Sequence, residues 1–194
     1  MPYTIVLAPP IDETEKYIKT SQELYSDYQP SYLLNSEGTS SPHITVVQFD
    51  CPTAEGAYEV WYKICDELDA LRFESFSPPF SGLAFVDGVG PYNNTTWVEL
   101  SVKRGDEDSP IMKVHCAALK VLKSSNIEPL NASQSNYRPH LTLARIILPK
   151  HVKTCPKSLY ENSGKFRMEF GLSDEKWQYA RTLEIFPEKD DERK

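Results

Sequence analysis

The sequence has few cysteines, and they lie far apart. The four are Cys51, Cys65, Cys116 and Cys155, with no Cys-x-x-Cys pair among them. This spacing is typical neither of a zinc site nor of a dense disulfide framework, so we expect reduced thiols in a reducing compartment, the cytoplasm or the nucleus. Histidine is equally scarce, with four residues, and no cluster of His, Asp and Glu has the spacing of metal ligands. We therefore expect no metal and no cofactor.

Long hydrophobic runs are also missing. The apolar run nearest the start, Thr4–Ala8, follows no basic segment and is too short for a signal peptide or a membrane span. We therefore expect no membrane partner. The Gly-x-Gly at Gly88–Gly90 lacks the rest of a dinucleotide-binding fingerprint, which excludes a phosphate-binding glycine loop of that kind.

Positive charge is scarce in the first half of the chain. Residues 1–100 hold 4 Lys and Arg against 15 Asp and Glu, and the whole chain has a net charge of −7. This acidity argues against a protein that coats long nucleic acids without regard to sequence. Residues 138–167 reverse the balance, with 7 Lys and Arg and one Glu. They are either a local field that attracts a phosphate or a solvated basic loop, and the sequence leaves the two open.

One short phrase occurs twice, as Pro-His-Ile-Thr-Val at Pro42–Val46 and as Pro-His-Leu-Thr-Leu at Pro139–Leu143. The 4 His and 11 Thr of this chain predict only about 0.2 His-x-Thr triplets by chance. Because side chains alternate along a strand, the His and the Thr of each copy point to one face and the apolar residues to the other. The alternative is that the phrase merely opens a strand, since Thr and β-branched residues favour strands.

Two such strands side by side would bring two imidazoles and two hydroxyls together. An unperturbed histidine titrates near 6.5, so a neutral ring can take a proton from water while a charged ring protonates a leaving alkoxide. Threonine hydroxyls can donate hydrogen bonds to the non-bridging oxygens of a phosphate. This scheme hydrolyses a phosphodiester without a metal. The sequence leaves open which histidine is the base.

The two motifs resemble those of the 2H phosphoesterase superfamily, in which two His-x-Thr motifs lie about half a chain apart. The likeness extends to Pro79–Val102, Ile111–Leu122 and Lys176–Pro187 and covers most of Met1–Pro187. It implies two lobes related by a pseudo-twofold axis, and cleavage of 2′,3′-cyclic, 1″,2″-cyclic, 2′,5′-linked or certain 3′,5′-linked ribose phosphates without metal. The site residues that it implies are His43, Thr45, His140 and Thr142.

Other candidate residues carry weaker signals. Tyr137 could stack a nucleobase and Arg138 could pair a phosphate, although surface packing explains both equally well. Tyr92, after the glycine turn, is a third such candidate for substrate binding. His115 lies on the apolar side of its helix and is expected to be a packed histidine. His151, in the basic stretch, is expected to be solvated.

The predicted elements indicate an α+β fold, with two pseudo-symmetric lobes of antiparallel sheet and outer helices around a central groove. Helices are predicted from Asp12 to Tyr25, from a cap at Thr53 to Leu71, and from Ser109 to Ser124. Strands are predicted over residues 3–8, 43–49, 72–76, 82–86, 95–103, 140–148, 165–170 and 176–186. Residues 1–187 are predicted to form one bilobal domain, followed by a charged tail at 188–194.

The predicted function is a metal-independent phosphodiesterase that hydrolyses 2′,3′-cyclic or 2′,5′-linked ribose phosphodiesters, in a nucleotide or at an RNA end. One alternative is a non-catalytic module of the same fold that binds nucleotides or RNA ends. A metal-dependent hydrolase is a second alternative. We expect the protein to act as a monomer.

Overall fold

The computed structural model describes residues 2–35, 40–88, 93–131, 133–147, 152–174 and 177–187. Tyr92, His151 and the expected tail at 188–194 lie outside these residues. Within them, the strands are β1 (Tyr3–Ala8), β2 (Tyr32–Leu33), β3 (Ile44–Phe49), β4 (Phe80–Asp87), β5 (Thr96–Val102), β6 (His140–Ile146), β7 (Arg167–Ser173) and β8 (Tyr179–Ile185). The α-helices are α1 (Ile11–Tyr25), α2 (Ala54–Ala70) and α3 (Pro110–Ser124).

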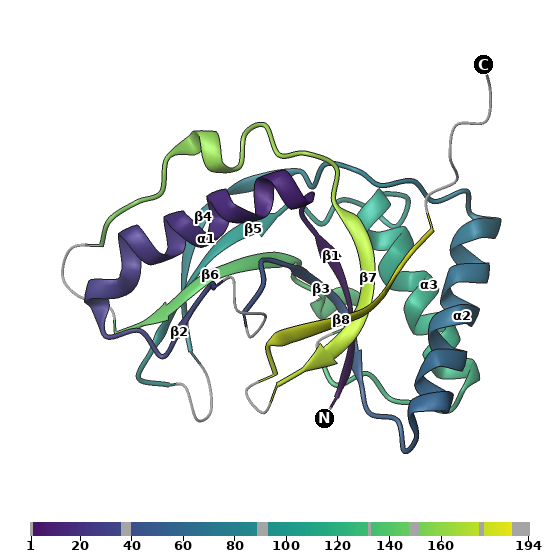
Figure 1. Cartoon of the computed structure of the whole chain (residues 1–194). Helices are drawn as coiled ribbons and strands as arrows, with labels where there is room; N and C mark the ends of the chain where they lie inside the picture. The colour runs from purple at the N-terminus through teal and green to yellow at the C-terminus, as the bar shows by residue number, and fades with distance from the viewer. Residues whose placement is uncertain are drawn as a thin grey trace.

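The described strands form one antiparallel sheet in the order β4-β5-β6-β3-β1-β7-β8, with β2 paired to β6 (Figure 1). The sheet has two halves, and β3 pairs with β6 at a single position, Ile44 opposite Leu141. Helix α1 packs against β6 and β2, whereas α3 packs against β3 and α2 packs against α3. The predicted α+β fold, with two antiparallel lobes and helices outside them, is confirmed.

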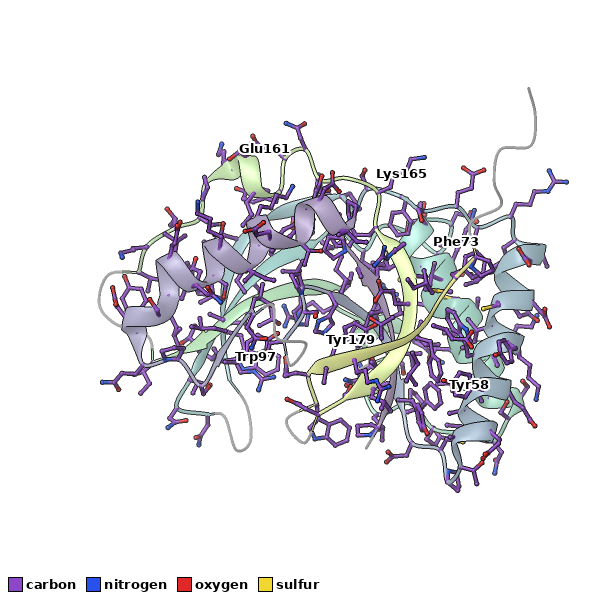
Figure 2. The ribbon with its side chains drawn as sticks, in the orientation of Figure 1. Tyr58, Phe73, Trp97, Glu161, Lys165 and Tyr179 are labelled. Carbon is purple, nitrogen blue, oxygen red and sulfur yellow. The ribbon has the colours of Figure 1, made fainter. Side chains whose placement is uncertain are left out.

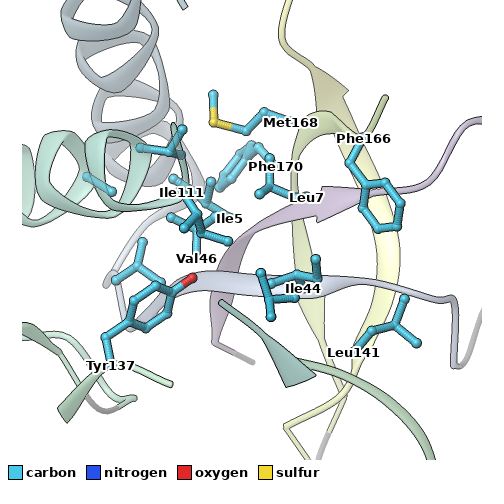
Figure 3. Close-up of a cluster of buried hydrophobic side chains, with 14 of the residues drawn as sticks. Ile5, Leu7, Ile44, Val46, Ile111, Tyr137, Leu141, Phe166, Met168 and Phe170 are labelled. Atoms are coloured by element: carbon cyan, nitrogen blue, oxygen red, sulfur yellow. The ribbon is translucent and has the colours of Figure 1, made fainter. Parts of the chain in front are cut away.

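The apolar residues of both motifs lie in the hydrophobic core, as predicted. Ile44, Val46, Leu141 and Leu143 are all fully buried. Figure 3 shows Ile44 and Val46 beside Ile5 and Leu7 of β1, with side chains of β7 and α3 around them. Burial of one such side chain stabilises the fold by about 1.5–3 kcal/mol, so the motif strands are firmly anchored on this side.

The predicted helices are confirmed with small differences at their ends. Thr53 caps α2, since its hydroxyl accepts a hydrogen bond of 3.1 Å from the Gly56 amide. Asp12 does not cap α1, because that helix begins one residue earlier, at Ile11, without a side-chain cap.

One strand prediction is wrong, and one strand was not predicted. Residues 72–76 form no strand and contribute only a bridge from Phe76 to Phe166. Pro78 and Pro79, which lack an amide hydrogen, separate this bridge from β4. The short strand β2 was not predicted, and it lies in the polar segment before the first motif.

Candidate active site

Four side chains share one face of the sheet, which we call the motif face: His43, Thr45, His140 and Thr142. Ile44 pairs with Leu141 in antiparallel register and both are fully buried, so the residues beside them point away from the core. Continuing the register by one residue puts His43 level with Thr142, and Thr45 level with His140. Side chains level on neighbouring antiparallel strands are about 5 Å apart at Cβ. The structure therefore brings the two motifs together, each histidine beside the threonine of the other copy.

Each motif strand carries a β-bulge directly after its threonine. In β3, Thr45 pairs with Val6 and Val47 with Ile5, which leaves Val46 without a partner on β1. In β6, Thr142 pairs with Glu99 and Ala144 with Val98, which leaves Leu143 without a partner on β5. A bulge adds one residue and changes which side chains share a face. The two bulges lie at equivalent positions, one residue after each threonine, so the similarity of the two halves extends beyond the sequence motif.

A buried side chain from a covering helix binds each bulged residue. His115 on α3 donates through Nδ1 to the Val46 carbonyl at 2.9 Å, and Ser21 on α1 donates through Oγ to the Leu143 carbonyl. Both His115 and Ser21 are fully buried. Each bulge is therefore held from the core side of the sheet by the helix that covers its own lobe.

Both motif histidines have the same tautomer. Nδ1 of His43 lies 2.7 Å from the Ser41 carbonyl, and Nδ1 of His140 lies 2.8 Å from the Arg138 carbonyl. A carbonyl only accepts, so each Nδ1 carries the hydrogen and each Nε2 has the lone pair. This is the tautomer that allows Nε2 to exchange a proton with a ligand on the motif face.

His43 lies in the more buried environment. Its side chain contacts the Tyr179 ring, with centroids 5.5 Å apart. Burial lowers the pKa of His43 to about 4, although its hydrogen bond to Ser41 opposes the shift. The positive charge of protonated His140 lowers the pKa of His43 further, which shows that the two imidazoles lie within each other's electrostatic reach. His43 is therefore neutral near pH 7.

His140 lies beside a buried carboxylate. Oε2 of Glu99 is 3.6 Å from its Nε2, and Glu99 is fully buried. Burial lowers the pKa of His140, whereas the negative charge of Glu99 is the largest effect that raises it. Arg138 forms an ion pair with the other carboxylate oxygen of Glu99. Glu169 also raises the pKa of His43, but among the described residues a carboxylate contact with Nε2 is found at His140 alone, so the two histidines differ in character.

Arg145 also belongs to the site, although strand alternation would place it on the core side. Because of the bulge at Leu143, Arg145 pairs with Trp97, which shares a face of β5 with Glu99. Its guanidinium lies 4.5 Å from the Trp97 ring centroid and is buried. The charge of Arg145 lowers the pKa of both His43 and His140. It supplies positive charge to the place where the two motifs meet.

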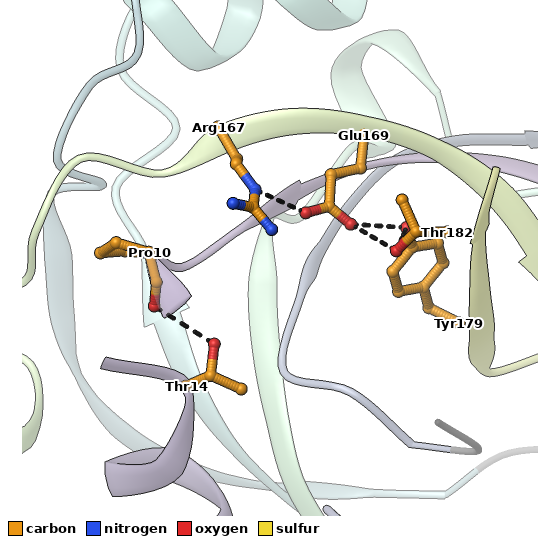
Figure 4. Close-up of polar contacts among 6 residues, drawn as sticks. All are labelled: Pro10, Thr14, Arg167, Glu169, Tyr179 and Thr182. Atoms are coloured by element: carbon orange, nitrogen blue, oxygen red, sulfur yellow. Dashed lines mark hydrogen bonds and ion pairs between the residues drawn. The ribbon is translucent and has the colours of Figure 1, made fainter. Parts of the chain in front are cut away.

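The β7–β8 hairpin adds a polar cluster around the buried Glu169 on the His43 side. Oε1 of Glu169 accepts from Arg167 Nε at 2.7 Å, and its Oε2 accepts from Tyr179 at 2.7 Å and from Thr182 at 2.8 Å (Figure 4). Trp97 and Tyr179 lie on opposite halves of the sheet (Figure 2), and each contacts the histidine of its own half.

The weaker candidates have different outcomes. Tyr137 does not present its ring to a nucleobase, because it is buried and stacks on His115 with ring centroids 3.8 Å apart. Its hydroxyl donates to the Thr45 carbonyl at 2.9 Å, so Tyr137 links the two motifs from behind. His115 is a packed histidine, as predicted. Arg138 is half-exposed and already paired with Glu99, and its contact with phosphate stays a prediction.

The basic stretch divides into two parts. Arg138, Arg145 and Arg167 lie around the motif residues, whereas Lys153, Lys157 and Lys165 are exposed to solvent. The solvated interpretation holds for the three lysines, whereas the attraction of a phosphate by the three arginines stays a prediction. The sequence analysis missed the buried carboxylates Glu99 and Glu169, although Glu99 is the single charged residue of its strand.

In the described residues, no group of three or more His, Cys, Asp and Glu side chains could hold a metal ion. The four cysteines are unpaired. No helix in the same part of the chain has both the length and the apolar character needed to cross a bilayer.

No protein-family model and no curated protein matches the sequence. Solved structures match the fold over nearly the whole chain. E. coli LigT complexed with 3′-AMP has a TM-score of 0.63 at 11% identity and covers 95% of this chain and 97% of that chain. A phosphoesterase has a TM-score of 0.52 at 12% identity, with 87% and 86% covered. Kluyveromyces marxianus Usb1 has a TM-score of 0.52 at 8% identity, with 96% and 97% covered. Together with the paired motifs, these matches show that the chain has the 2H phosphoesterase fold.

Proposed function

We propose that this protein is a metal-independent phosphodiesterase that hydrolyses 2′,3′-cyclic or 2′,5′-linked ribose phosphodiesters, in a nucleotide or at an RNA end. The observation that carries the proposal is the pairing of the two motif strands at Ile44 and Leu141, whose register, continued by one residue, sets His43 level with Thr142 and Thr45 level with His140. A phosphate on this face would meet a proton carrier and a hydroxyl from each motif. E. coli LigT, which has the same fold, binds 3′-AMP, a ribose phosphate.

The environments of the histidines support different roles for them. A general base must begin neutral, and burial keeps His43 in that form. A general acid must begin protonated, and the carboxylate of Glu99 near Nε2 favours the imidazolium of His140. We therefore assign His43 as the base that activates water and His140 as the acid that protonates the leaving alkoxide. The phosphate's own negative charge also favours this proton on His140 when substrate is bound.

The remaining groups would stabilise the charge that builds on the phosphorane. Thr45 and Thr142 are partly exposed on the motif face, and within the described residues no protein group takes up either hydroxyl. Arg145 lies close enough to act on both imidazoles and adds a buried positive charge. Donors and charges fixed before the reaction stabilise the transition state without reorganisation.

The test is a substrate panel in the presence of a chelator. The purified protein is incubated with 2′,3′-cyclic nucleotides and with 2′,5′-linked oligoadenylate in EDTA, and products are separated by chromatography. We expect turnover that EDTA does not reduce and that is lost in His43→Ala and in His140→Ala. Loss of turnover in EDTA that a divalent cation restores would indicate the metal-dependent alternative instead.

The second candidate is a module that binds nucleotides or RNA ends without turnover. The buried Glu99 beside His140 argues against it, since binding alone needs no carboxylate next to a proton carrier. Binding of the panel compounds without any product, in the wild-type protein across pH 4 to 8, would favour this module.

A further inference from the structure

A cavity opens near His43 at one edge of the motif face. It has a volume of about 670 Å³ and lies between α1 and the β7–β8 hairpin. Ser41 and Pro42, which directly precede His43, line it together with Tyr179, whose ring contacts His43. Pockets for small organic ligands have volumes of roughly 300–1,000 Å³. The cavity is thus large enough for a ligand, and it borders on the residues that precede and contact His43.

The strand next to β3 leaves room for this cavity. Leu7 pairs with Ile44, and Ala8 pairs with Arg167, so one more step of the register puts Ala8 level with His43. Ala8 lines the cavity, and its small side chain separates His43 from Arg167. Two strand spacings are roughly 10 Å, which a ribose and its base can span.

The His140 side has different neighbours, although Ser101 of β5, which lies opposite His140, is about as small as Ala8. Here the neighbouring strand β5 carries Glu99 opposite Thr142, whereas β1 carries Val6 opposite Thr45. Glu99 is fully buried against His140 and Arg138. The two halves share their motifs but differ in the residues that flank them, and the cavity lies on the His43 side.

The walls of the cavity suit a nucleoside. Pro9, Ile11 and Ile18 offer apolar surface, while Gln22 and Asn35 supply amide groups. The fork of Arg167 is oriented by Glu169, which accepts from its Nε at 2.7 Å and is itself held by Tyr179 and Thr182. An oriented guanidinium donates to the acceptor atoms on a base edge.

We propose, on the basis of the function proposed above, that this cavity is the nucleoside subsite. The nucleoside that carries the reacting phosphate lies between α1 and the hairpin, and Arg167 donates to acceptor atoms of its base. The phosphate reaches the motif face next to Ala8, with its leaving oxygen toward His140.

Binding measurements test the subsite without turnover. Calorimetry compares adenosine 3′-monophosphate with inorganic phosphate in wild type, Arg167→Met, Ile18→Trp and the control Lys113→Met, which removes an exposed positive charge on α3. We expect the two cavity variants to weaken binding of the nucleotide about 10- to 100-fold and that of phosphate less than about twofold. Arg167→Met removes hydrogen bonds from a charged group, whereas Ile18→Trp fills part of the cavity. Lys113→Met should leave both unchanged.

Two results would overturn the subsite: equal loss for nucleotide and phosphate in both cavity variants, or no loss in either. Thermal unfolding shows which variants fold, and because Ile18→Trp leaves Arg167 and Glu169 intact, it tests the cavity if Arg167→Met does not fold. If the wild type binds the nucleotide with the expected variant pattern but hydrolyses nothing, the subsite stands and the proposed hydrolysis fails.

Discussion

His115 Nδ1 donates a hydrogen bond of 2.9 Å to the carbonyl of Val46, the bulged residue that follows the first motif. The Gln134 amide donates to its Nε2 at 3.2 Å, so both ring nitrogens are occupied and the neutral ring has one tautomer. Tyr137 stacks on this ring and donates to the Thr45 carbonyl. We infer that His115 and Tyr137 together hold Thr45, the threonine of the first motif, in position.

Two amide substitutions separate this positioning from simple packing. His115→Asn puts an amide nitrogen near the place of Nδ1 and can still donate to Val46, whereas His115→Gln reaches the place of Nε2 and leaves the carbonyl without its donor. We expect kcat to fall about 10-fold in His115→Gln, with KM nearly unchanged, and only a few-fold in His115→Asn, as one buried hydrogen bond is worth about 1–3 kcal/mol. Steady-state kinetics on the 2′,3′-cyclic substrate provide both values.

Both substitutions remove the ring that stacks on Tyr137, so their melting temperatures should fall by similar amounts. Tyr137→Phe removes the hydroxyl that donates to the Thr45 carbonyl. Tyr62→Phe is its matched control, because the Tyr62 hydroxyl donates a 2.9 Å hydrogen bond to Glu184 on the surface, away from the motifs. Equal kcat values for His115→Asn and His115→Gln would show that His115 contributes only to packing and does not position Thr45.

The pH dependence of kcat/KM follows from the two imidazoles. The free protein is active when His43 is neutral, above its pKa of about 4, and when His140 is protonated, below a pKa that burial lowers from the usual 6.5. We expect a bell-shaped profile with its optimum on the acid side of neutrality. The negative charge of a bound phosphate raises the pKa of both histidines, so the kcat profile should lie at higher pH than the kcat/KM profile. A kcat/KM optimum above pH 7.5 would refute the assignment of roles.

Glu99→Gln tests the origin of the alkaline limb. The Glu99 charge is the largest effect that raises the pKa of His140, so its removal should shift the alkaline limb to lower pH and leave the acid limb in place. Arg138 is half-exposed, and water can solvate it in this variant. Asp108→Asn, an equal charge change at an exposed position, should leave both limbs unchanged. A shift of the acid limb alone would reverse the roles of the two histidines.

Removal of the motif side chains should affect turnover strongly and unequally. We expect His43→Ala and His140→Ala each to lower kcat/KM by about 10²–10⁴, and Thr45→Val and Thr142→Val by about 10–100. The double histidine variant should be hardly worse than either single one, because the two rings act as a unit. Circular dichroism confirms that each variant folds, and unchanged activity in either histidine variant would exclude the mechanism.

His43 also makes stability depend on pH. Its pKa is about 4 when folded and near 6.5 when unfolded, so the unfolded chain binds more protons between these values. The difference between the folded and unfolded pKa values of His43 corresponds to about 3 kcal/mol of folding free energy. This free energy is present above pH 6.5 and is lost as the pH falls to about 4. We expect His43→Gln to lose less stability than wild type between pH 7 and pH 4 in urea titrations. Parallel losses would show that His43 is not buried as a neutral group.

Much of the fold follows from local sequence signals. The Thr53 cap and the apolar spacing after it predict α2 because capping and helical periodicity act within a few residues. The two motif strands follow from period-two alternation, which also assigns Ile44 and Leu141 to the core. Arg72–Phe76 fails as a strand because pairing, and not propensity, decides whether a short apolar run joins a sheet.

The sequence by itself determined which residues can carry the chemistry, since a repeated His-x-Thr on a strand puts an imidazole and a hydroxyl on one face. Tertiary structure alone decided their neighbours. The bulge at Leu143 turns Arg145 toward the motif face, and the pairing of β5 with β6 places Glu99 beside His140. These relations depend on register between strands that lie far apart in the chain, and register is set by long-range packing that no local pattern encodes.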